Sequence, residues 1–246
     1  MNPTPSRRKT NVLGLVPARG GSKGLPRKNL VPVCGKPLLA YTVEEALASR
    51  SLSRVVVSTD DDEIARVARY LGAEVPFMRP SELARDDTPA LPVIRHAVSA
   101  LEEAEGWVSQ IIVYLQPTSP LRRRQHIDQA VELLVSEGAD TVVSVVPVPH
   151  QFNPVSLMRL EGGCLVPFLP EGPEPLRRQD KPTLYARNGP AVLACTYETV
   201  MRRGLLYGER TLPLFMTHEE SVDVDSPFDL AMAEWILKAR KQTICG

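Results

Sequence analysis

The sequence has few cysteines and no long hydrophobic run, and each absence excludes a class of protein. Its four cysteines, Cys34, Cys164, Cys195 and Cys245, include no CxxC pair. This spacing argues against a structural zinc site or a disulfide framework, and scattered free thiols are typical of the reducing cytoplasm. No apolar run approaches the ~20 residues that a membrane-spanning helix needs. We therefore expect a cytoplasmic protein without a membrane segment.

An excess of charge of either sign is also missing. Lys+Arg and Asp+Glu both number 29, so the net charge is zero. Proteins that bind nucleic acids or anionic membranes usually carry a basic excess, so we expect neither partner. Any anion site must therefore be built from locally clustered lysines and arginines.

The start of the chain lacks the features of a signal peptide. The basic residues before position 10 are followed only by a short apolar stretch, which Pro17 interrupts. Hydrophobic residues make up 43% of the 246 residues, enough for a sizeable core. We expect a flexible tail over 1–10 and a single domain over 11–246.

Short apolar runs alternate with amphipathic segments along most of the chain. The expected strands cover 12–17, 54–60, 110–116, 141–146 and 191–194. The expected helices cover 37–49, 61–71, 88–105, 127–137 and 230–239, the third of them capped by Thr88 with Pro89 in its first turn. This alternation predicts an α/β fold with a mostly parallel, Rossmann-like sheet flanked by helices. Continuous Val/Ile runs indicate strands that are buried on both faces.

The pattern changes at about 147–187. Prolines and glycines become frequent there, and only short strands such as Cys164–Pro167 are recognisable. We interpret this segment as a small insertion that forms a β-arm or a dimer contact.

The stretch VPARGGSKGLPRKN over 16–29 directly follows the first predicted strand. Ligands of open α/β sheets bind beyond the carboxyl ends of the strands. Glycines let backbone N–H groups approach an anion closely, and clustered cations suit a triphosphate. The glycines are Gly20, Gly21 and Gly24, and the cations are Arg19, Lys23, Arg27 and Lys28. The alternative is a solvated basic loop, because the spacing matches neither a Walker A motif nor GxGxxG.

The stretch LQPTSPLR over 115–122 ends the third predicted strand with polar side chains. Pro117 and Pro120 restrict the loop and remove two backbone donors. Gln116 and Ser119 are then available to sugar hydroxyls. A turn without a ligand at the strand end is the alternative.

Near the C-terminus, VDVD over 222–225 places two carboxylates two residues apart. On an extended segment Asp223 and Asp225 point to the same face, and a divalent cation would relieve their repulsion. Oxygen ligands without Cys or His favour Mg²⁺ or Mn²⁺. Alternatively one of the pair caps the following helix, although Ser226 is also suited to that role. The acidic run 60–63 is more consistent with a helix start than with a second metal site.

The string ARGGSKGLPRKN over 18–29 resembles the signature of acylneuraminate cytidylyltransferases, the CMP-sialic acid synthetases. Further matching strings follow in family order over nearly the whole chain: VSTD at 57–60, RPSEL at 79–83, DT at 87–88, LQPTSPLR at 115–122, RQD at 178–180, NG at 188–189 and VDVD at 222–225. The related synthetases for the eight-carbon sugar Kdo have a different first loop. The resemblance implies a nucleotide-diphospho-sugar transferase fold and a homodimer joined through the insertion. It also implies transfer of CMP from CTP to the anomeric hydroxyl of a sialic-acid-like nonulosonic acid, an acidic keto-sugar, with release of pyrophosphate.

The resemblance also assigns roles to individual residues. Those that would bind the nucleotide are Ala18, Arg19, Gly20, Ser22, Lys23, Lys28, Asn29 and Arg79, the last two near the cytosine and ribose. Those that would face the acidic sugar are Gln116, Ser119, Arg178, Gln179 and Asn188. Asp223 and Asp225 would hold Mg²⁺ or Mn²⁺, and the catalytic group would comprise Arg19, Lys23, Lys28 and Asp225. No side chain stands out as a general base.

Several positions depart from the family pattern. The loop at 85–87 carries one extra residue, and Leu91 stands where a small polar residue is found in relatives. The family often has an aromatic residue shortly after Asn-Gly, near the acyl group of the sugar, whereas here Asn188-Gly189 is followed by Pro-Ala-Val-Leu. We therefore expect the region of Val192 to offer a smaller wall to that acyl group. Considered by itself, Arg79 is typical of a surface arginine.

Two other functions remain open. One alternative is a nucleotidyltransferase for another sugar or base, and the other is a non-catalytic nucleotide-binding protein of the same fold. The basic loop, Gln116 and both late aspartates occur together, which argues against the non-catalytic alternative.

Overall fold

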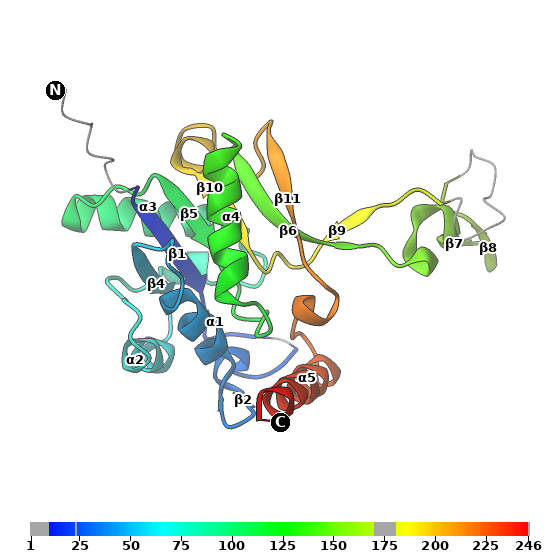
Figure 1. The fold of residues 1–246 in the computed structure, drawn as a ribbon, viewed down its shortest axis with the longest axis horizontal. Coiled ribbons are helices and arrows are strands. Elements are labelled where there is room, and N and C mark those ends of the chain that lie inside the picture. Colours follow the sequence, from blue (N-terminus) through cyan, green and yellow to red (C-terminus); the bar gives the residue numbers. More distant parts are fainter. Residues whose placement is uncertain (1–9, 23, 170–180, 246) are drawn as a thin grey trace.

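The computed structural model describes residues 10–22, 24–169 and 181–245, with side chains described up to residue 240. A seven-stranded sheet forms its centre (Figure 1). Its path runs in the order β11 (Thr211–Phe215), β6 (Thr141–Pro147), β10 (Leu193–Thr196), β5 (Ile111–Tyr114), β1 (Val12–Pro17) and β4 (Arg54–Ser58), and β9 (Tyr185–Arg187) pairs with β6.

Most strands of this sheet run in one direction. β1 pairs in parallel with both β4 and β5. β10 is antiparallel to both of its neighbours, β5 and β6, so β6 runs in the same direction as β5. β11 pairs in parallel with β6, whereas β9 is antiparallel to it. The predicted mostly parallel α/β sheet is confirmed, with one reversed strand inside it.

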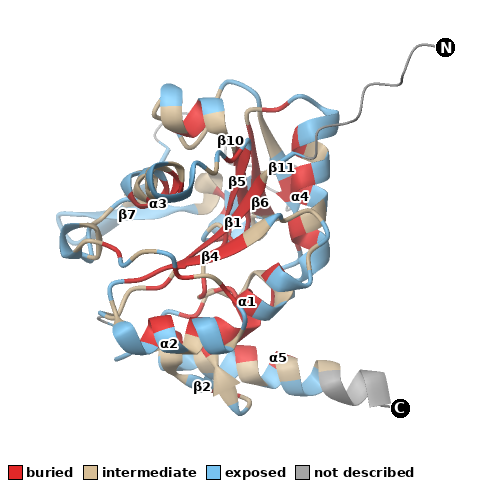
Figure 2. Ribbon diagram, turned by 90° about the vertical axis from the view of Figure 1, so that its left-hand side faces the viewer, coloured by how far each residue is buried: buried red, intermediate tan, exposed pale blue. Residues whose placement is uncertain are grey.

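Helices cover both faces of the sheet. One face packs against α1 (Leu38–Leu47), α2 (Asp62–Tyr70) and α4 (Arg124–Ser136), and the other against α3 (Ala90–Glu105) and a π-helical turn (Glu198–Arg202). Figure 2 shows the buried residues concentrated on the strands between α3 and α4. A third cluster packs α5 (Pro227–Cys245) against α1 and the hairpin of β2 (Pro32–Val33) and β3 (Lys36–Pro37). Among the described residues no helix has the length and apolarity needed to cross a membrane.

One local prediction was wrong, and one strand was missed. Thr88 does not cap α3, because its hydroxyl donates to the Glu82 carbonyl at 3.4 Å and the helix begins two residues later, after Pro89. β11 was not predicted, since Pro213 interrupts its apolar pattern. That strand lies at the edge of the sheet, where a proline is tolerated because one side of the strand needs no ladder donor.

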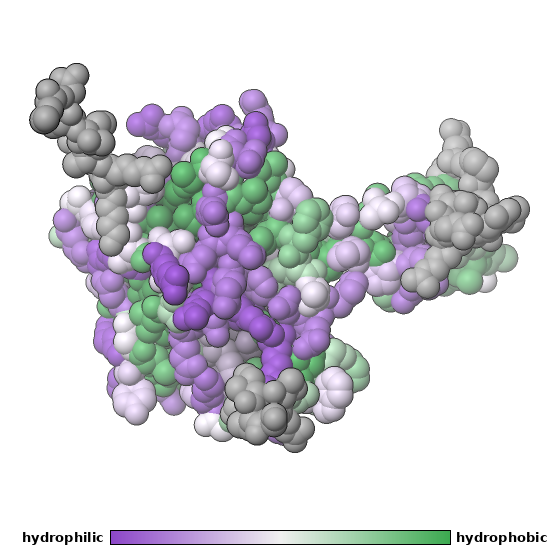
Figure 3. Space-filling model, viewed as in Figure 1, coloured by the Kyte–Doolittle hydropathy of each residue, from purple (hydrophilic) through white to green (hydrophobic). Residues whose placement is uncertain are grey.

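An arm projects from the body beside β6 and β9 (Figure 1). Within the described residues it consists of 148–169 and 181–184. It contains the short helical turns His150–Phe152 and Pro154–Ser156 and the antiparallel hairpin of β7 (Met158–Glu161) and β8 (Cys164–Pro167). Hydrophobic side chains lie on its surface in Figure 3, and Leu160 and Leu165, paired across the hairpin, are 71% and 66% exposed. The predicted tail lies almost entirely outside the described residues, which begin at Thr10.

Candidate functional site

The candidate site lies at the carboxyl end of β1, where the glycine-rich loop begins. β1 is flanked by β4 and β5, so polar residues that follow these three strands meet at one edge of the sheet. They surround a pocket of about 270 Å³, here called the loop pocket. Its lining includes Arg19, Ser22, Lys28, Asn29, Arg79, Gln116, Asp223 and Asp225. Eight residues proposed from the sequence are therefore brought together.

Two glycines of the loop allow close contacts with segments distant in the sequence. An ideal Cβ on Gly20 would lie 2.7 Å from Oδ2 of Asp61, and the Gly20 N–H donates to Oδ1 of Asp60 at 3.0 Å. An ideal Cβ on Gly24 would lie 2.5 Å from the Asp225 carbonyl oxygen. Both distances are too short for a side chain, so glycine at these positions holds the loop against the end of β4 and the segment before α5.

The cations of the loop that the structure describes, Arg19, Arg27 and Lys28, are paired with carboxylates. The Lys28 Nζ lies 2.5 Å from Oδ1 of Asp225, and Arg19 pairs with Asp86. Arg27 lies away from these pairs, with its Nη2 2.6 Å from Oε2 of Glu63. Lys28 and Arg19 thus point into the loop pocket, whereas Arg27 contacts the start of α2 and is not among its lining residues.

One wall of the pocket is formed by Arg79 and Tyr114. The side chain of Arg79 is buried, and its Nε donates to Oγ of Ser58 at 3.0 Å. Burial lowers the pKa of the Arg79 guanidinium and raises the pKa of the Tyr114 hydroxyl to about 12. Asn29 donates from Nδ2 to the Arg19 carbonyl at 2.9 Å, and this hydrogen bond fixes the start of the glycine-rich loop. Arg79 is therefore a buried lining residue of the pocket and not a surface arginine.

The loop after β5 contributes Gln116 and Thr118 to the pocket. Arg122 supports this loop from within the protein, because its Nη1 donates to the carbonyls of Gln116 at 3.0 Å and Ala191 at 2.8 Å. Ser119 is 1% exposed and is not one of the lining residues. Its Oγ has no hydrogen-bond partner among the described residues. Gln116 is thus placed in the pocket and Ser119 beneath it.

Asp223 and Asp225 reach the pocket from the segment before α5. The Val224 N–H donates to the Thr118 carbonyl at 2.8 Å, and the Val224 side chain is buried in the cluster that α5 forms with α1 and the β2–β3 hairpin. Burial raises the pKa of Asp223, and the nearby charge of Asp225 adds to this increase. The Oδ1 atom of Asp223 is buried without a hydrogen-bond partner in the described structure.

Neither aspartate is used as a helix cap. Ser226 caps α5, since its Oγ accepts from the Asp229 N–H at 3.3 Å. Asp229 in turn accepts from the Ser226 N–H at 2.8 Å, as in a capping box. At α2 the cap is Asp61, whose Oδ1 accepts from the N–H groups of Glu63 and Ile64 at 2.9 Å each. The capping alternative for Asp223 and Asp225 is therefore wrong, and the acidic run at 60–63 starts a helix as expected.

The remaining proposed residues lie beside or outside the pocket. Asn188 is buried, with Oδ1 accepting from Ser144 at 2.5 Å and Nδ2 donating to Ser221 at 2.7 Å. It joins β6 to the segment before Asp223 and does not line the loop pocket. Ala18 is fully buried at the end of β1. Lys23, Arg178 and Gln179 lie outside the described residues.

The expectation for Val192 was wrong. Its side chain is fully buried in the core cluster that β1 forms with α1, α2 and α4. Val192 therefore faces the protein interior, and its side chain cannot form a wall of a sugar pocket.

The sequence reasoning also missed several lining residues. Tyr114 was assigned only to a strand, and Arg85 and Asp86 only to a loop with one extra residue. Leu83 and Thr88 were matched to family strings, and Thr88 to a helix cap, but neither was proposed to line the site. The position of Tyr114 two residues before Gln116, on the same side of a strand that ends at the site, was a usable signal. The contribution of 83–88 depends on how this loop folds back over β1, which no local pattern indicates.

The donor set fits a divalent cation only in part. No group of three or more His, Cys, Asp or Glu side chains suited to a metal occurs in the described part of the chain. Asp223 and Asp225 offer carboxylate oxygens, and the unpartnered Oδ1 of Asp223 is a free acceptor. Mg²⁺ is usually bound by one or two carboxylates together with substrate phosphates and water, so this pair fits such a site.

Comparison with known proteins places the chain in a family. The cytidylyltransferase family profile matches residues 13–233. A CMP-N,N'-diacetyllegionaminic acid synthase from Legionella pneumophila is 33% identical over 234 residues, which cover 95% of this chain and 99% of that protein. The chain belongs to the cytidylyltransferase family. It is therefore a nucleotidyltransferase, and the resemblance found in the sequence is confirmed.

Other relatives differ in length. An N-acylneuraminate cytidylyltransferase from Escherichia coli is 32% identical over 92% of this cytidylyltransferase, which spans 52% of that relative's length. Among solved structures, a CMP:2-keto-3-deoxy-manno-octonic acid synthetase complexed with CTP aligns with a TM-score of 0.69 over 94% of this chain and 100% of that one. At 16% identity this alignment shows the shared nucleotidyltransferase fold.

The close contact at Gly24 leads to a prediction. Gly24→Ala forces the loop and the Asp225 carbonyl apart, so we expect it to lower the free energy of unfolding by ~1–3 kcal/mol. Gly21→Ala is the matched control, because an ideal Cβ there meets no atom within 4 Å. Denaturant unfolding of both variants without nucleotide measures the difference. Equal losses in the two variants would contradict the proposed contact.

Proposed function

We propose that this protein transfers CMP from CTP to the anomeric hydroxyl of a sialic-acid-like nonulosonic acid and releases pyrophosphate. The observation that supports this proposal best is the meeting of the glycine-rich basic loop and the Asp223/Asp225 pair in one pocket of a cytidylyltransferase. Relatives named as synthases of CMP-diacetyllegionaminic acid and as N-acylneuraminate cytidylyltransferases favour this class of acceptor.

The triphosphate of CTP is proposed to bind along the loop. Arg19 and Lys28 point into the loop pocket, where phosphate oxygens would replace Asp86 and Asp225 as their partners. Ser22 adds a hydroxyl donor, and Lys23 completes the group by resemblance. Charge-assisted hydrogen bonds of this kind are stronger than neutral ones, which favours a ligand with several charged oxygens.

The nucleoside is proposed to lie against the wall formed by Arg79 and Tyr114. The Arg79 side chain is held rigidly by Ser58, so its position is set before the ligand arrives. Thr88 and Leu83 line the same pocket from the loop over β1. These groups provide polar and apolar contacts for a base and a ribose.

Asp223 and Asp225 are proposed to hold Mg²⁺ or Mn²⁺. Such an ion would neutralise phosphate charge and polarise the α-phosphate. Asp223 and Asp225 stand on either side of the buried Val224 in the sequence, and this spacing lets both carboxylates line the pocket. Burial raises the pKa of Asp223, and a bound cation would favour its ionised form.

The proposed reaction is an in-line attack of the anomeric hydroxyl oxygen on the α-phosphorus of CTP. An oxygen–phosphorus bond forms to the sugar, the bond to the bridging oxygen breaks, pyrophosphate leaves, and the hydroxyl proton is released. Catalysis of this type rests mainly on positioning and charge neutralisation. Arg19, Lys23 and Lys28 would stabilise the leaving pyrophosphate. No group is assigned as the general base.

The sugar is proposed to bind beside Gln116. Gln116 lines the loop pocket, and Gly189 lies against both its Oε1 and the Asp223 carboxylate. Arg178 and Gln179 are kept as sugar ligands by resemblance, since an arginine fork suits the carboxylate of a keto-sugar acid. Asn188 is proposed to act by placing Gly189, because its own amide is fully bonded inside the protein.

Location and assembly are also proposals. Cys34, Cys164 and Cys195 are free thiols, which suits a reducing cytoplasm. A homodimer joined through the arm is supported by the exposed apolar residues of its hairpin. Isolated exposed side chains are ordinary, but several together on a projecting element favour a contact.

The metal assignment predicts a large loss of activity in two variants. Asp223→Asn and Asp225→Asn should each lower turnover by ~100-fold or more, because metal-held charge stabilisation is worth several kcal/mol. Asp62→Asn, at an exposed position of α2, is the control and should keep wild-type turnover. Pyrophosphate release at varied Mg²⁺ and Mn²⁺, together with thermal melting, checks this. Wild-type turnover in both pocket variants would contradict the site.

The acceptor class predicts a graded preference among nine-carbon acids. N-acetylneuraminate, diacetyllegionaminate and pseudaminate should differ by ~10- to 200-fold in kcat/KM, the range that a few carbon atoms produce in a pocket. Kdo should be poorer than the best of them. Arg178→Ala should reduce kcat/KM for every acid, whereas Arg159→Ala, an exposed arm residue, should not. A preference for Kdo, or an unchanged Arg178→Ala enzyme, would overturn this assignment.

The dimer predicts a change of mass when the arm is altered. We expect a dimer for the wild type at micromolar concentration. The Leu160→Glu/Leu165→Glu variant should become monomeric, because buried charge would oppose the contact. Val135→Glu, on the exposed side of α4, should remain dimeric. Light scattering checks all three, and a monomeric wild type would rule the dimer out.

A further inference from the structure

A second pocket, of about 700 Å³, lies at the N-terminus of α4. None of its lining residues lines the loop pocket. Five cations line it: Lys36, Arg122, Arg123, Arg124 and Arg240. Only Glu44 and Glu45 among its lining residues are acidic. We call it the arginine pocket, and its lining carries a clear excess of positive charge.

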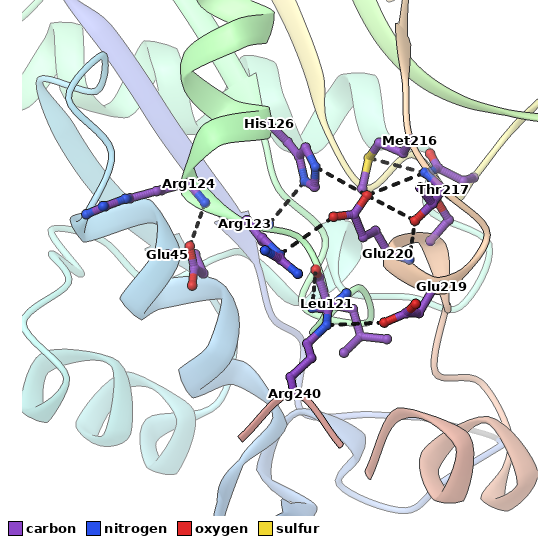
Figure 4. A network of polar contacts seen from close by, with 12 residues as sticks. Glu45, Leu121, Arg123, Arg124, His126, Met216, Thr217, Glu219, Glu220 and Arg240 are labelled. Atoms are coloured by element: carbon purple, nitrogen blue, oxygen red, sulfur yellow. Dashed lines mark hydrogen bonds and ion pairs between the residues drawn. The ribbon is translucent and has the colours of Figure 1, made fainter. Parts of the chain in front are cut away.

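The carboxylates around this pocket compensate only some of the cations. Lys36 pairs with Glu44. Arg123 Nε lies 3.6 Å from Oε1 of Glu220, and Arg240 Nε lies 3.4 Å from Oε1 of Glu219. Glu219 and Glu220 are not lining residues of the pocket, and Figure 4 shows their pairs with Arg240 and Arg123.

Arg124 stands apart from these pairs. Its backbone N–H donates to Oε2 of Glu45 at 2.5 Å, so that carboxylate binds the first turn of α4. Its guanidinium has no carboxylate partner within the described ranges. Arg124 is exposed, so its guanidinium is accessible to a ligand from solvent.

Arg122 is the buried cation of the arginine pocket. It is 2% exposed, and its Nε and Nη2 have no hydrogen-bond partner in the described structure. Burial lowers the pKa of this guanidinium to about 9, against the opposing effect of the Glu45 charge. A buried cation with unsatisfied donors is costly unless an anion lies nearby. Nη2 of Arg240 is also buried without a partner.

The N-terminus of α4 adds to the positive charge of the arginine pocket. Its first turn contains no acidic residue, and its N-cap is Arg123 rather than a residue with a carboxylate or hydroxyl side chain. The partial positive charge of a helix N-terminus favours anions. Two independent features, the helix end and the unsatisfied Arg122, therefore act on the same pocket.

We propose that the arginine pocket binds a small phosphate-bearing anion. Through Arg122, the bound anion would alter the position of the loop after β5, here called the substrate loop. Guanidinium forks match phosphate oxygens, and several of them together favour a multiply charged phosphate over a single carboxylate. The volume is in the range of small-molecule sites.

The route of the coupling is short. Arg122 Nη1 donates to the Gln116 carbonyl, and the Gln116 side chain lines the loop pocket. An anion bound in the arginine pocket attracts the Arg122 guanidinium and thereby changes the support under Gln116. Coupling between the two pockets is reciprocal, so sugar binding also changes the affinity for the anion. This inference goes beyond the proposed reaction and uses it only for a kinetic readout.

Calorimetry with inorganic phosphate tests binding directly. The protein is first saturated with CTP, so that phosphate cannot bind in the loop pocket, and ionic strength is held constant with chloride. We expect phosphate to bind the wild type and to bind Arg124→Glu at least ~10-fold more weakly, since a charge-assisted contact becomes a repulsion. Arg66→Glu, at an exposed position of α2, should bind as the wild type does.

The outcomes are distinguishable. Absence of phosphate binding to the CTP-saturated wild type overturns the site, and so does equal weakening in the two variants. Failure of CTP itself to bind refutes the proposed function instead, and phosphate is then titrated without it, where loss of binding in Arg124→Glu alone still supports the site.

Kinetics test the coupling. In the wild type, millimolar phosphate should change the KM for the sugar by ~5-fold or more, the usual lower range of allosteric effects. Arg124→Glu should keep the basal activity and lose this response, while Arg66→Glu should keep both. Phosphate binding without any change in KM overturns the role of Arg122 as the connection.

Discussion

The contact between the glycine-rich loop and the segment before α5 is the constraint on which the site depends. The Gly24 backbone packs against the Asp225 carbonyl so closely that no side chain fits between them. This contact joins two parts of the chain that are some two hundred residues apart, and the Lys28–Asp225 pair reinforces it. Because of it, Arg19 and Lys28, the cations proposed to bind phosphate, line the same pocket as the two carboxylates. Without it the protein would carry a basic loop and an acidic segment, each paired with water.

The same arrangement explains why a neutral protein can offer a strongly polar site. Charges of both signs are concentrated at one sheet edge, and they neutralise each other there until a charged ligand competes. The arginine pocket is different, because its charges are not balanced locally. Arg122 connects the two regions, since one side of its guanidinium supports the substrate loop and the other has unsatisfied donors.

Much of the fold followed from the sequence, for a physical reason. The strands before residue 147 are continuous Val/Ile runs buried on both faces, and the helices between them show one apolar face, so local patterns agree with the tertiary structure. The glycine-rich loop and the two late aspartates were recognisable from residue types and spacing that are themselves local. Edge strand β11 was missed because Pro213 breaks its pattern, and Asn188 was misplaced because a polar side chain gives no sign that it will be consumed by Ser144 and Ser221. The part of the pocket lined by Leu83 and Thr88 depends on how their loop folds back over β1, which local propensity does not encode.

The position of β10 has a consequence for how the chain is made. This strand lies between β5 and β6, both of which leave the ribosome long before it. The arm is synthesised in the interval, which at ~5–20 residues/s lasts several seconds. During that time β5 and β6 each have an open edge in a sheet whose middle strand is missing. A strand that is synthesised late therefore closes the centre of the sheet, and the exposed edges must be kept from pairing with other chains until then.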